Sequence, residues 1–184
     1  MPTPTVRLLS PTEDAHLVPY IAAIHAACIS HDQMIATFLP PLSNEKLLAY
    51  WREKIADTTA GTRFIVILLN ESEPGTVAKG PELMGVVSLS MAQTETLARN
   101  AVVEKLMVSP KYRQKGAARA MMEFLETEAL SRRRTLLLLD TEVGSAAEKV
   151  YPRLGYIEIG RIPKYCISPS GDMKDELFFY KQLS

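Results

Sequence analysis

A loop of charged and small residues, "SPKYRQKGAARAMMEF" at positions 109–124, contains residue types that could do chemistry. Lys111, Arg113 and Lys115 precede Gly116, and an alanine- and methionine-rich helical pattern follows directly. The start of a helix presents unpaired backbone N–H groups and the positive end of the helix dipole, which together can bind an anion. A glycine without a Cβ also lets a ligand approach the backbone closely. The loop therefore suits a phosphate group; the alternative is a solvated basic turn between a strand and a helix.

Spacing excludes several familiar sites. The sequence has no GxxxxGK[ST] for a P-loop and no GxGxxG for a dinucleotide fold, so the loop needs another kind of phosphate ligand. Cys28 and Cys166 lie far apart without CxxC spacing, and all three histidines precede residue 32. Since metal sites need clustered ligands, we expect neither a zinc site nor any other metal, and no disulfide framework.

The hydrophobic pattern predicts the elements that position this loop. Strands are predicted at residues 5–9, 63–70, 83–91, 100–108, 135–140, 156–162 and 175–183. One helix is predicted from an N-cap at Ser10, one from an N-cap at Ser43, one from Ala117 with Ala118 on its buried face, and one over residues 145–155. The succession of strand, helix and strand from 102 to 140 favours a right-handed parallel crossover, with the apolar "TLLLLD" as a buried strand. We expect the α/β class, with a mixed central sheet of about six to seven strands and about four helices.

The whole chain limits the classes of function. A length of 184 residues fits a single domain, 1–184. Lys plus Arg and Asp plus Glu both number 21, so the formal net charge is zero and no global field favours nucleic acid or an anionic membrane. The apolar runs are too short to span a bilayer, and the N-terminus lacks a secretory apolar core. We therefore expect a cytoplasmic protein with no nucleic-acid or membrane partner.

Two motifs in order along the chain resemble the GNAT superfamily of N-acetyltransferases. "VEKLMVSPKYRQKGAARAMM" is similar to the cofactor motif, whose R/Q-x-x-G-x-G/A core stands at residues 113–118. "AEKVYPRLGY", residues 147–156, is similar to the A-x-x-L-Y-x-x-x-G-F/Y element further along. The order of elements is also similar over most of the chain. "LDTEVGSAAEKVYPRLGY" and "DELFFYKQL" look most like the branch that includes tabtoxin-resistance acetyltransferase.

The resemblance implies acetyl-CoA as cosubstrate, with its pyrophosphate on the backbone amides of residues 114–118 and its pantetheine arm along the preceding strand. Arg113 and Lys115 would assist, because long side chains are less fixed than helix-start amides. Ser145 could replace the family's usual Asn, at whose position Gly144 stands. The implied cofactor-binding residues are Leu106, Met107, Val108, Arg113, Gln114, Lys115, Gly116, Ala117, Ala118 and Ser145.

Acetyl transfer to an amine needs a base and an acid. An alkyl ammonium with a pKa of about 10 must lose a proton, and the departing thiolate needs one. Glu104 is the first candidate for the base, and Asp140, at the C-terminal edge of its strand, is the second; their roles could be exchanged. Tyr151 occupies the family's acid position, although Pro152 after it can kink the helix. Each residue also has a structural alternative. Glu104 could be a solvent-facing strand residue, Asp140 could cap the turn into the next helix, and Tyr151 could pack in the core.

Three functions follow from these residues. The first is direct transfer of acetyl to the primary amine of a small molecule in a ternary complex, since no cysteine lies in either motif. The second is transfer to a peptide N-terminus or lysine, and the third is a noncatalytic acyl-CoA sensor. The resemblance also implies that the protein could form a homodimer. Met34, Phe38, Leu39 and Trp51 could shape the acceptor pocket or simply pack in the core.

Overall fold

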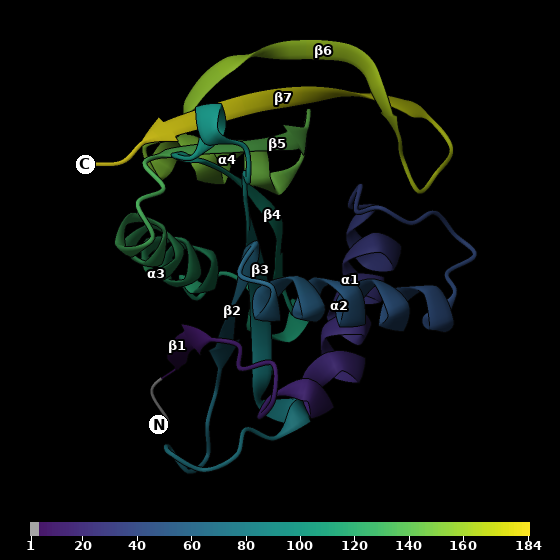
Figure 1. Ribbon diagram of the computed structural model, residues 1–184. Helices are drawn as coiled ribbons and strands as arrows, with labels where there is room; N and C mark the ends of the chain where they lie inside the picture. Colours follow the sequence, from purple (N-terminus) through teal and green to yellow (C-terminus); the bar gives the residue numbers. More distant parts are fainter. Residues whose placement is uncertain (1–3) are drawn as a thin grey trace.

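The computed structural model describes residues 4–184 and shows a sheet with helices on both faces (Figure 1). Its strands are β1 Thr5–Leu8, β2 Arg63–Leu69, β3 Leu83–Met91, β4 Asn100–Val108, β5 Leu136–Glu142, β6 Ile157–Ile167 and β7 Met173–Gln182. Its α-helices are α1 Val18–Asp32, α2 Asn44–Thr59, α3 Ala117–Ser131 and α4 Ala146–Arg153. Within residues 4–184 this gives seven strands and four α-helices, which confirms the predicted α/β class.

The seven strands form one mixed sheet in the order β1-β2-β3-β4-β5-β7-β6. The pairing of β4 with β5 is parallel, and the other pairings are antiparallel. Helix α3 connects these two parallel strands, which confirms the parallel arrangement expected for the crossover between residues 102 and 140. The C-terminal hairpin of β6 and β7 extends past β5 toward the side of α1 and α2 (Figure 1).

Two hydrophobic cores lie on opposite faces of the sheet, which Figure 1 shows as α3 on one side and α1 with α2 on the other. Alternate residues of β2 enter each core, because successive strand side chains point to opposite faces. Phe64 and Val66 pack with α3 and α4 residues such as Met121 and Tyr151. Ile65 packs with residues of α1 and α2 on the other face.

Helix α2 begins where its sequence predicts. The Ser43 side chain accepts a hydrogen bond from the Lys46 amide at 3.3 Å and so forms the N-cap. Leu47, Trp51 and Ile55 recur every fourth residue and are buried against the sheet. Strands β3 and β4 also have their predicted bounds.

The first helix was predicted wrongly at its start. It begins at Val18 rather than beside Ser10, after a turn and a short 3-10 segment at Ala15–Leu17. A helix running from residue 11 would have Pro19 in its interior, where the ring clashes with the preceding turn and the N–H bond is missing. In the structure Pro19 lies in the first turn of α1, a position that tolerates proline.

Strand β5 is less buried than its apolar sequence predicts. Leu137 and Leu139 face the α3 core, whereas Leu136 and Leu138 are partly exposed on the other face. The second core contains no residue of β5, β6 or β7, since α1 and α2 pack against β2 to β4. Ala118 is likewise only partly buried at the start of α3. Across residues 4–184, we find no helix with the length and apolar character to cross a membrane.

Candidate active site

The two parallel strands separate partway along the sheet. Pairing joins residues 100–102 of β4 to residues 136–138 of β5, although β4 continues to Val108 and β5 to Glu142. Beyond these pairs, β3 occupies the far edge of β4 and β7 occupies the far edge of β5. The facing edges are therefore left without a partner strand among the described residues. An extended amide-bearing ligand could pair with the free edge of β4 as an added strand does.

A β-bulge bends β4 at this opening. The register with β3 shifts between Val86 and Ser88, and Lys105 adopts the left-handed conformation with φ of 58°. A bulge of this kind leaves one residue unpaired and increases the local twist. Of the predicted pantetheine residues, Leu106 belongs to the bulge and Met107 comes directly after it, on the part of β4 that has left β5.

The loop after β4 ends in an open helix start. Gly116 is the N-cap of α3 with φ of 75°, and a Cβ built there would meet no protein atom within 4 Å. The Ala120 amide bonds to the Gly116 carbonyl at 3.0 Å, so the preceding amides of the first turn have no intrahelical acceptor. Gln114, with φ of 60°, lies beside them. This geometry provides what an anion site at a helix start requires.

Two basic side chains of this loop, Arg113 and Lys115, contact other side chains. The Arg113 guanidinium is bonded through two nitrogens to the Asp32 carboxylate at the end of α1, and it donates to the Val108 carbonyl at 3.3 Å. The Lys115 ammonium lies 5.8 Å from the centre of the Tyr112 ring. Arg113 therefore ties the loop to α1, and the first-turn amides of α3 remain available to a ligand.

Ser145 caps the helix that carries the predicted acid. Its hydroxyl accepts from the Glu148 amide at 3.3 Å and is 2.9 Å from the Thr141 hydroxyl. Gly144 precedes it with φ of 86°, a conformation that few residues other than glycine adopt. The Ser145 hydroxyl thus has a structural role in α4, and its contact with a cofactor stays a prediction.

Tyr151 lies in the core beneath the sheet opening. It is 6% exposed, and its ring packs against Tyr156 and Phe179 with centroids 5.8 Å and 5.9 Å away. Burial, and then the charge of Asp140, raise the pKa of the Tyr151 phenol above its ordinary value. The amides of Leu154 and Tyr156 bond to the Tyr151 carbonyl, so the turn closes despite Pro152. A phenol in this environment stays protonated at neutral pH and is a weaker acid than an exposed tyrosine.

The two candidate bases differ in their environments. The Glu104 carboxylate accepts from the Arg63 guanidinium at 2.5 Å, and Arg63 is itself buried. Asp140 is exposed and has no ion-pair partner among residues 4–184. Lys105 belongs to the same group: burial lowers the pKa of its ammonium, while the charges of Glu104 and Asp140 oppose that shift. The structure therefore brings both carboxylates and Lys105 to the opening of the sheet.

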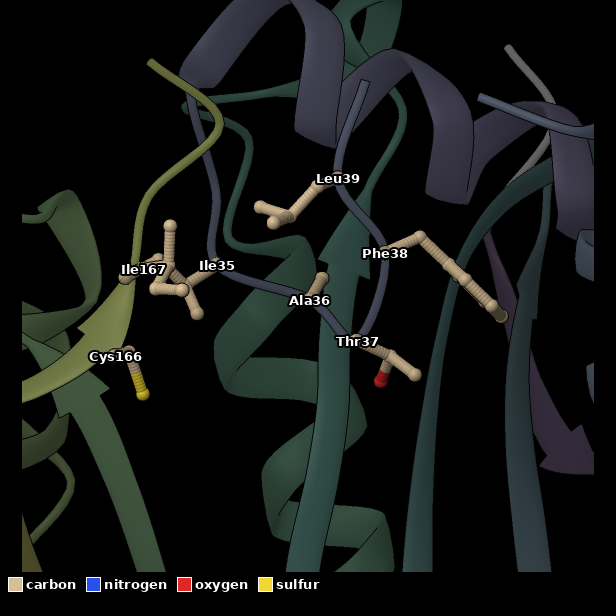
Figure 2. A pocket seen from close by; sticks show the side chains of 7 residues that line it. All are labelled: Ile35, Ala36, Thr37, Phe38, Leu39, Cys166 and Ile167. Carbon is tan, nitrogen blue, oxygen red and sulfur yellow. The ribbon is translucent and has the colours of Figure 1, made fainter. Parts of the chain in front are cut away.

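A cavity lies between the α1–α2 loop and β6, as Figure 2 shows. Its volume is about 330 Å³, and residues 35–39 line one side while Cys166 and Ile167 line the other. Of the residues predicted to shape an acceptor pocket, Phe38 and Leu39 line this cavity. Met34 packs instead against the α1–α2 core.

Buried polar contacts fix the cavity's loop. The His25 Nε2–H donates to the Ala36 carbonyl at 2.7 Å, and the Trp51 indole N–H donates to His25 Nδ1 at 3.1 Å. Burial lowers the pKa of His25 to about 4, so the imidazole is neutral and its tautomer is set by these two bonds. Trp51 therefore acts on the cavity indirectly, by holding His25.

Lys105 and Glu176 were not among the predicted site residues. Lys105 gave no signal because the bulge that places it depends on pairing with β3. Glu176 reads in the sequence as one polar residue of an alternating strand, and its place beside Asp140 depends on the pairing of β5 with β7. The burial of its carboxyl group is what distinguishes Glu176, and the alternating sequence of the strand does not reveal that burial.

The separated parallel strands and the open helix start after the first of them, with titratable side chains beside them, are the arrangement expected of an acyltransferase of the α/β class. The sequence model of the acetyltransferase (GNAT) family matches residues 32–156, more than half of the chain. The chain belongs to this family, whose members use acetyl-CoA as cosubstrate, and is an acetyltransferase.

Similar folds occur in solved structures. A Salmonella typhimurium protein described as an acetyltransferase, solved with its cofactor acetyl-CoA, is 20% identical with a TM-score of 0.73, covering 99% of this chain and 95% of that chain. A ribosomal-protein-alanine N-acetyltransferase from Brucella melitensis is 19% identical with a TM-score of 0.71, covering 97% and 99%. A protein described as a phosphinothricin N-acetyltransferase is 17% identical with a TM-score of 0.73, covering 99% of each chain. At these identities the similarity establishes the fold.

Proposed function

We propose that this acetyltransferase modifies the primary amine of a small molecule by direct attack on acetyl-CoA in a ternary complex. The observation that carries the proposal is the cavity of about 330 Å³ between residues 35–39 and β6. Its volume is within the range of small-molecule sites, which start at about 300 Å³. His25 holds one wall from the core, so the space is preformed and bounded on two sides.

The proposed reaction uses the groups around the opening. The acceptor ammonium gives a proton to Glu104 or Asp140, and the amine nitrogen then attacks the thioester carbonyl carbon. A C–N bond forms and the C–S bond breaks. The thiolate takes a proton from the Tyr151 hydroxyl, and the second proton lost by nitrogen restores Tyr151. The predicted cofactor residues of β4 and the 113–118 loop would hold acetyl-CoA along the free strand edge and at the start of α3.

Both cysteines favour direct transfer over an acetyl-enzyme. Burial raises the pKa of the Cys28 thiol to about 11, and burial followed by the charge of Glu176 raises that of Cys166 to about 11. The thiolate is the nucleophilic form of cysteine, so both thiols are poor nucleophiles at neutral pH. This supports a mechanism in which the amine itself attacks the thioester.

Three further features belong to the same proposal. We assign the chain to the branch that includes tabtoxin-resistance acetyltransferase, on its sequence motifs and on its fold similarity to the protein described as a phosphinothricin N-acetyltransferase. Residues 1–184 form one domain, supported by a single sheet that runs from β1 to β7. We place the protein in the cytoplasm, working without nucleic acid or membrane, as a possible homodimer.

An acceptor panel tests the proposed function. The wild-type protein is mixed with acetyl-CoA and, in turn, amino acids, polyamines, amine antibiotics and peptides with free N-termini or lysines, and thiol release is recorded. We expect release with at least one small primary amine and a kcat/KM for it at least about 10-fold above that for any peptide. A preference for peptides would contradict the small-molecule acceptor and support a peptide or protein acceptor instead. Tight acetyl-CoA binding without thiol release from any amine would favour the sensor function.

A further inference from the structure

Three carboxyl side chains lie on one face of the C-terminal half of the sheet. Glu142 of β5 is paired directly with Glu176 of β7, and directly paired residues point to the same face. Asp140 precedes Glu142 by two residues and therefore shares this face. Leu137 and Leu139 of the same strand point the other way, into the α3 core. The carboxyl face is thus the one on the side of α1, α2 and the cavity.

Asp140 and Glu176 are diagonal neighbours on this face and differ greatly in exposure. Asp140 is exposed at the sheet opening, whereas Glu176 is only 4% exposed. Asp140 and the Cys166 thiol, which lines the cavity, are near enough to the Glu176 carboxyl to act on its pKa. Its Oε2 oxygen is buried and has no hydrogen-bond partner within residues 4–184. A carboxyl group left in this way is costly to keep charged unless a proton or a cation joins it.

Titratable groups on four strands, β4 to β7, face Asp140 and Glu176. Glu142 lies beside it on β5, Cys166 on β6 and Lys174 on β7, and Lys105 of β4 acts on Asp140. No ion pair to Asp140 or Glu176 is present in the described part of the chain. Burial, and then Asp140, raise the pKa of Glu176 to about 8. Glu176 therefore holds a proton at neutral pH and becomes free to accept one as pH rises through about 8.

The other candidate base lacks these properties. The Glu104 charge is already balanced by the Arg63 guanidinium at 2.5 Å, which also donates to the Ser88 hydroxyl at 2.9 Å. The Glu104 carboxylate is thus already engaged by a buried guanidinium, whereas Asp140 has no ion-pair partner among residues 4–184. A base that titrates near the working pH is better matched to an ammonium group.

We propose that Asp140 and Glu176 act as one unit that accepts the proton of the acceptor's ammonium group, with Asp140 contacting the nitrogen and Glu176 sharing the proton from behind. This inference rests on the proposed function, because it needs an amine acceptor at the cavity. One proton passes from nitrogen to the pair, the neutral amine then forms the C–N bond, and the pair releases its proton to solvent afterwards. Glu176 is a positioning residue here, since Asp140 makes the contact.

The pH dependence of kcat/KM tests the pair, with the best acceptor from the panel as substrate. The wild type should gain activity as pH rises through an apparent pKa near 8. Glu176→Gln leaves Asp140 alone, so this limb should move to lower pH by more than about one unit and the plateau should fall roughly 10-fold. Asp140→Asn removes the contacting group and should lower the plateau by about 10²- to 10⁴-fold. Glu104→Gln serves as the comparison, and it should lower the plateau of kcat/KM less than Asp140→Asn does.

An unchanged limb near pH 8 in Glu176→Gln, or a larger loss in Glu104→Gln than in Asp140→Asn, would overturn the inference while leaving amine acetylation intact. A second readout needs no acceptor. A raised folded-state pKa means that the wild type loses stability as pH rises from about 4.5 to 8, because the folded state must release a proton that the unfolded state has already lost. Glu176→Gln should therefore raise the melting temperature relative to wild type by roughly 3 °C or more at pH 9. That gain should shrink toward pH 5, and a pH-independent gain would contradict the shared proton.

Discussion

Replacing Gly116 with glutamate should weaken acetyl-CoA binding by more than about 100-fold. A Cβ at Gly116 meets no protein atom within 4 Å, so the new side chain would occupy the open space in front of the α3 amides. Its carboxylate would then lie where the pyrophosphate is expected and repel it, as well as competing for the same N–H donors. Isothermal titration calorimetry with acetyl-CoA measures the loss.

Two variants separate the charge from backbone strain. Gly116→Gln has nearly the same shape as the glutamate variant without its charge, and should bind acetyl-CoA more tightly than Gly116→Glu. Gly61, with φ of 77° and equally open surroundings, lies in the turn between α2 and β2 at the other end of the strands. Gly61→Glu carries a similar left-handed strain of about 1–2 kcal/mol and should bind acetyl-CoA normally. Normal binding by Gly116→Glu would remove the loop from the cofactor site.

The second large effect is expected at Tyr151. Tyr151→Phe should lower kcat by about 10²-fold or more, because the departing thiolate loses its proton donor. The phenylalanine ring keeps the packing against Tyr156 and Phe179, so the fold should be maintained. The acetyl-CoA dissociation constant should stay within about 2-fold, since the hydroxyl acts on the leaving group rather than on binding. Steady-state kinetics and calorimetry give the two quantities separately.

Tyr156→Phe is the matched control for this variant. Its ring lies 5.8 Å from that of Tyr151 and packs in the same core, but we assign it no part in the reaction. Its kcat should remain within about 2-fold of wild type. An equal loss of kcat in both variants would indicate a general effect of core hydroxyl groups and would refute the acid role of Tyr151.

Local patterns account for the parts of the fold that were predicted correctly. The Ser43 cap, the four-residue spacing of Leu47 and Trp51, and the exact bounds of β3 and β4 depend on residues close together in the sequence. The Gly116 N-cap of α3 belongs to the same group, because a glycine N-cap with a following helix is a local arrangement. Such features are visible in the sequence because neighbouring residues determine them.

The acceptor side depends on distant contacts and could not be predicted in the same way. The Lys105 bulge exists only through pairing with β3, and the loop at Ala36 is held by His25 and Trp51 from two different helices. Glu176 meets Asp140 because β7 inserts between β5 and β6 in the sheet. The predicted start of α1 was wrong for a different reason: two local signals competed, and Pro19, eight residues after Pro11, set the boundary in place of the N-cap signal at Ser10.

The central claim is that acetyl passes directly from acetyl-CoA to the amine of a small molecule. The most direct test supplies acetyl-CoA labelled with ¹³C in the acetyl group together with the best acceptor from the panel, and follows the label by NMR and mass spectrometry. We predict one ¹³C-acetyl amide on the acceptor nitrogen for each thiol released, with no label on the protein. Label found as free acetate, on a protein side chain, or only on peptide amines would contradict this account.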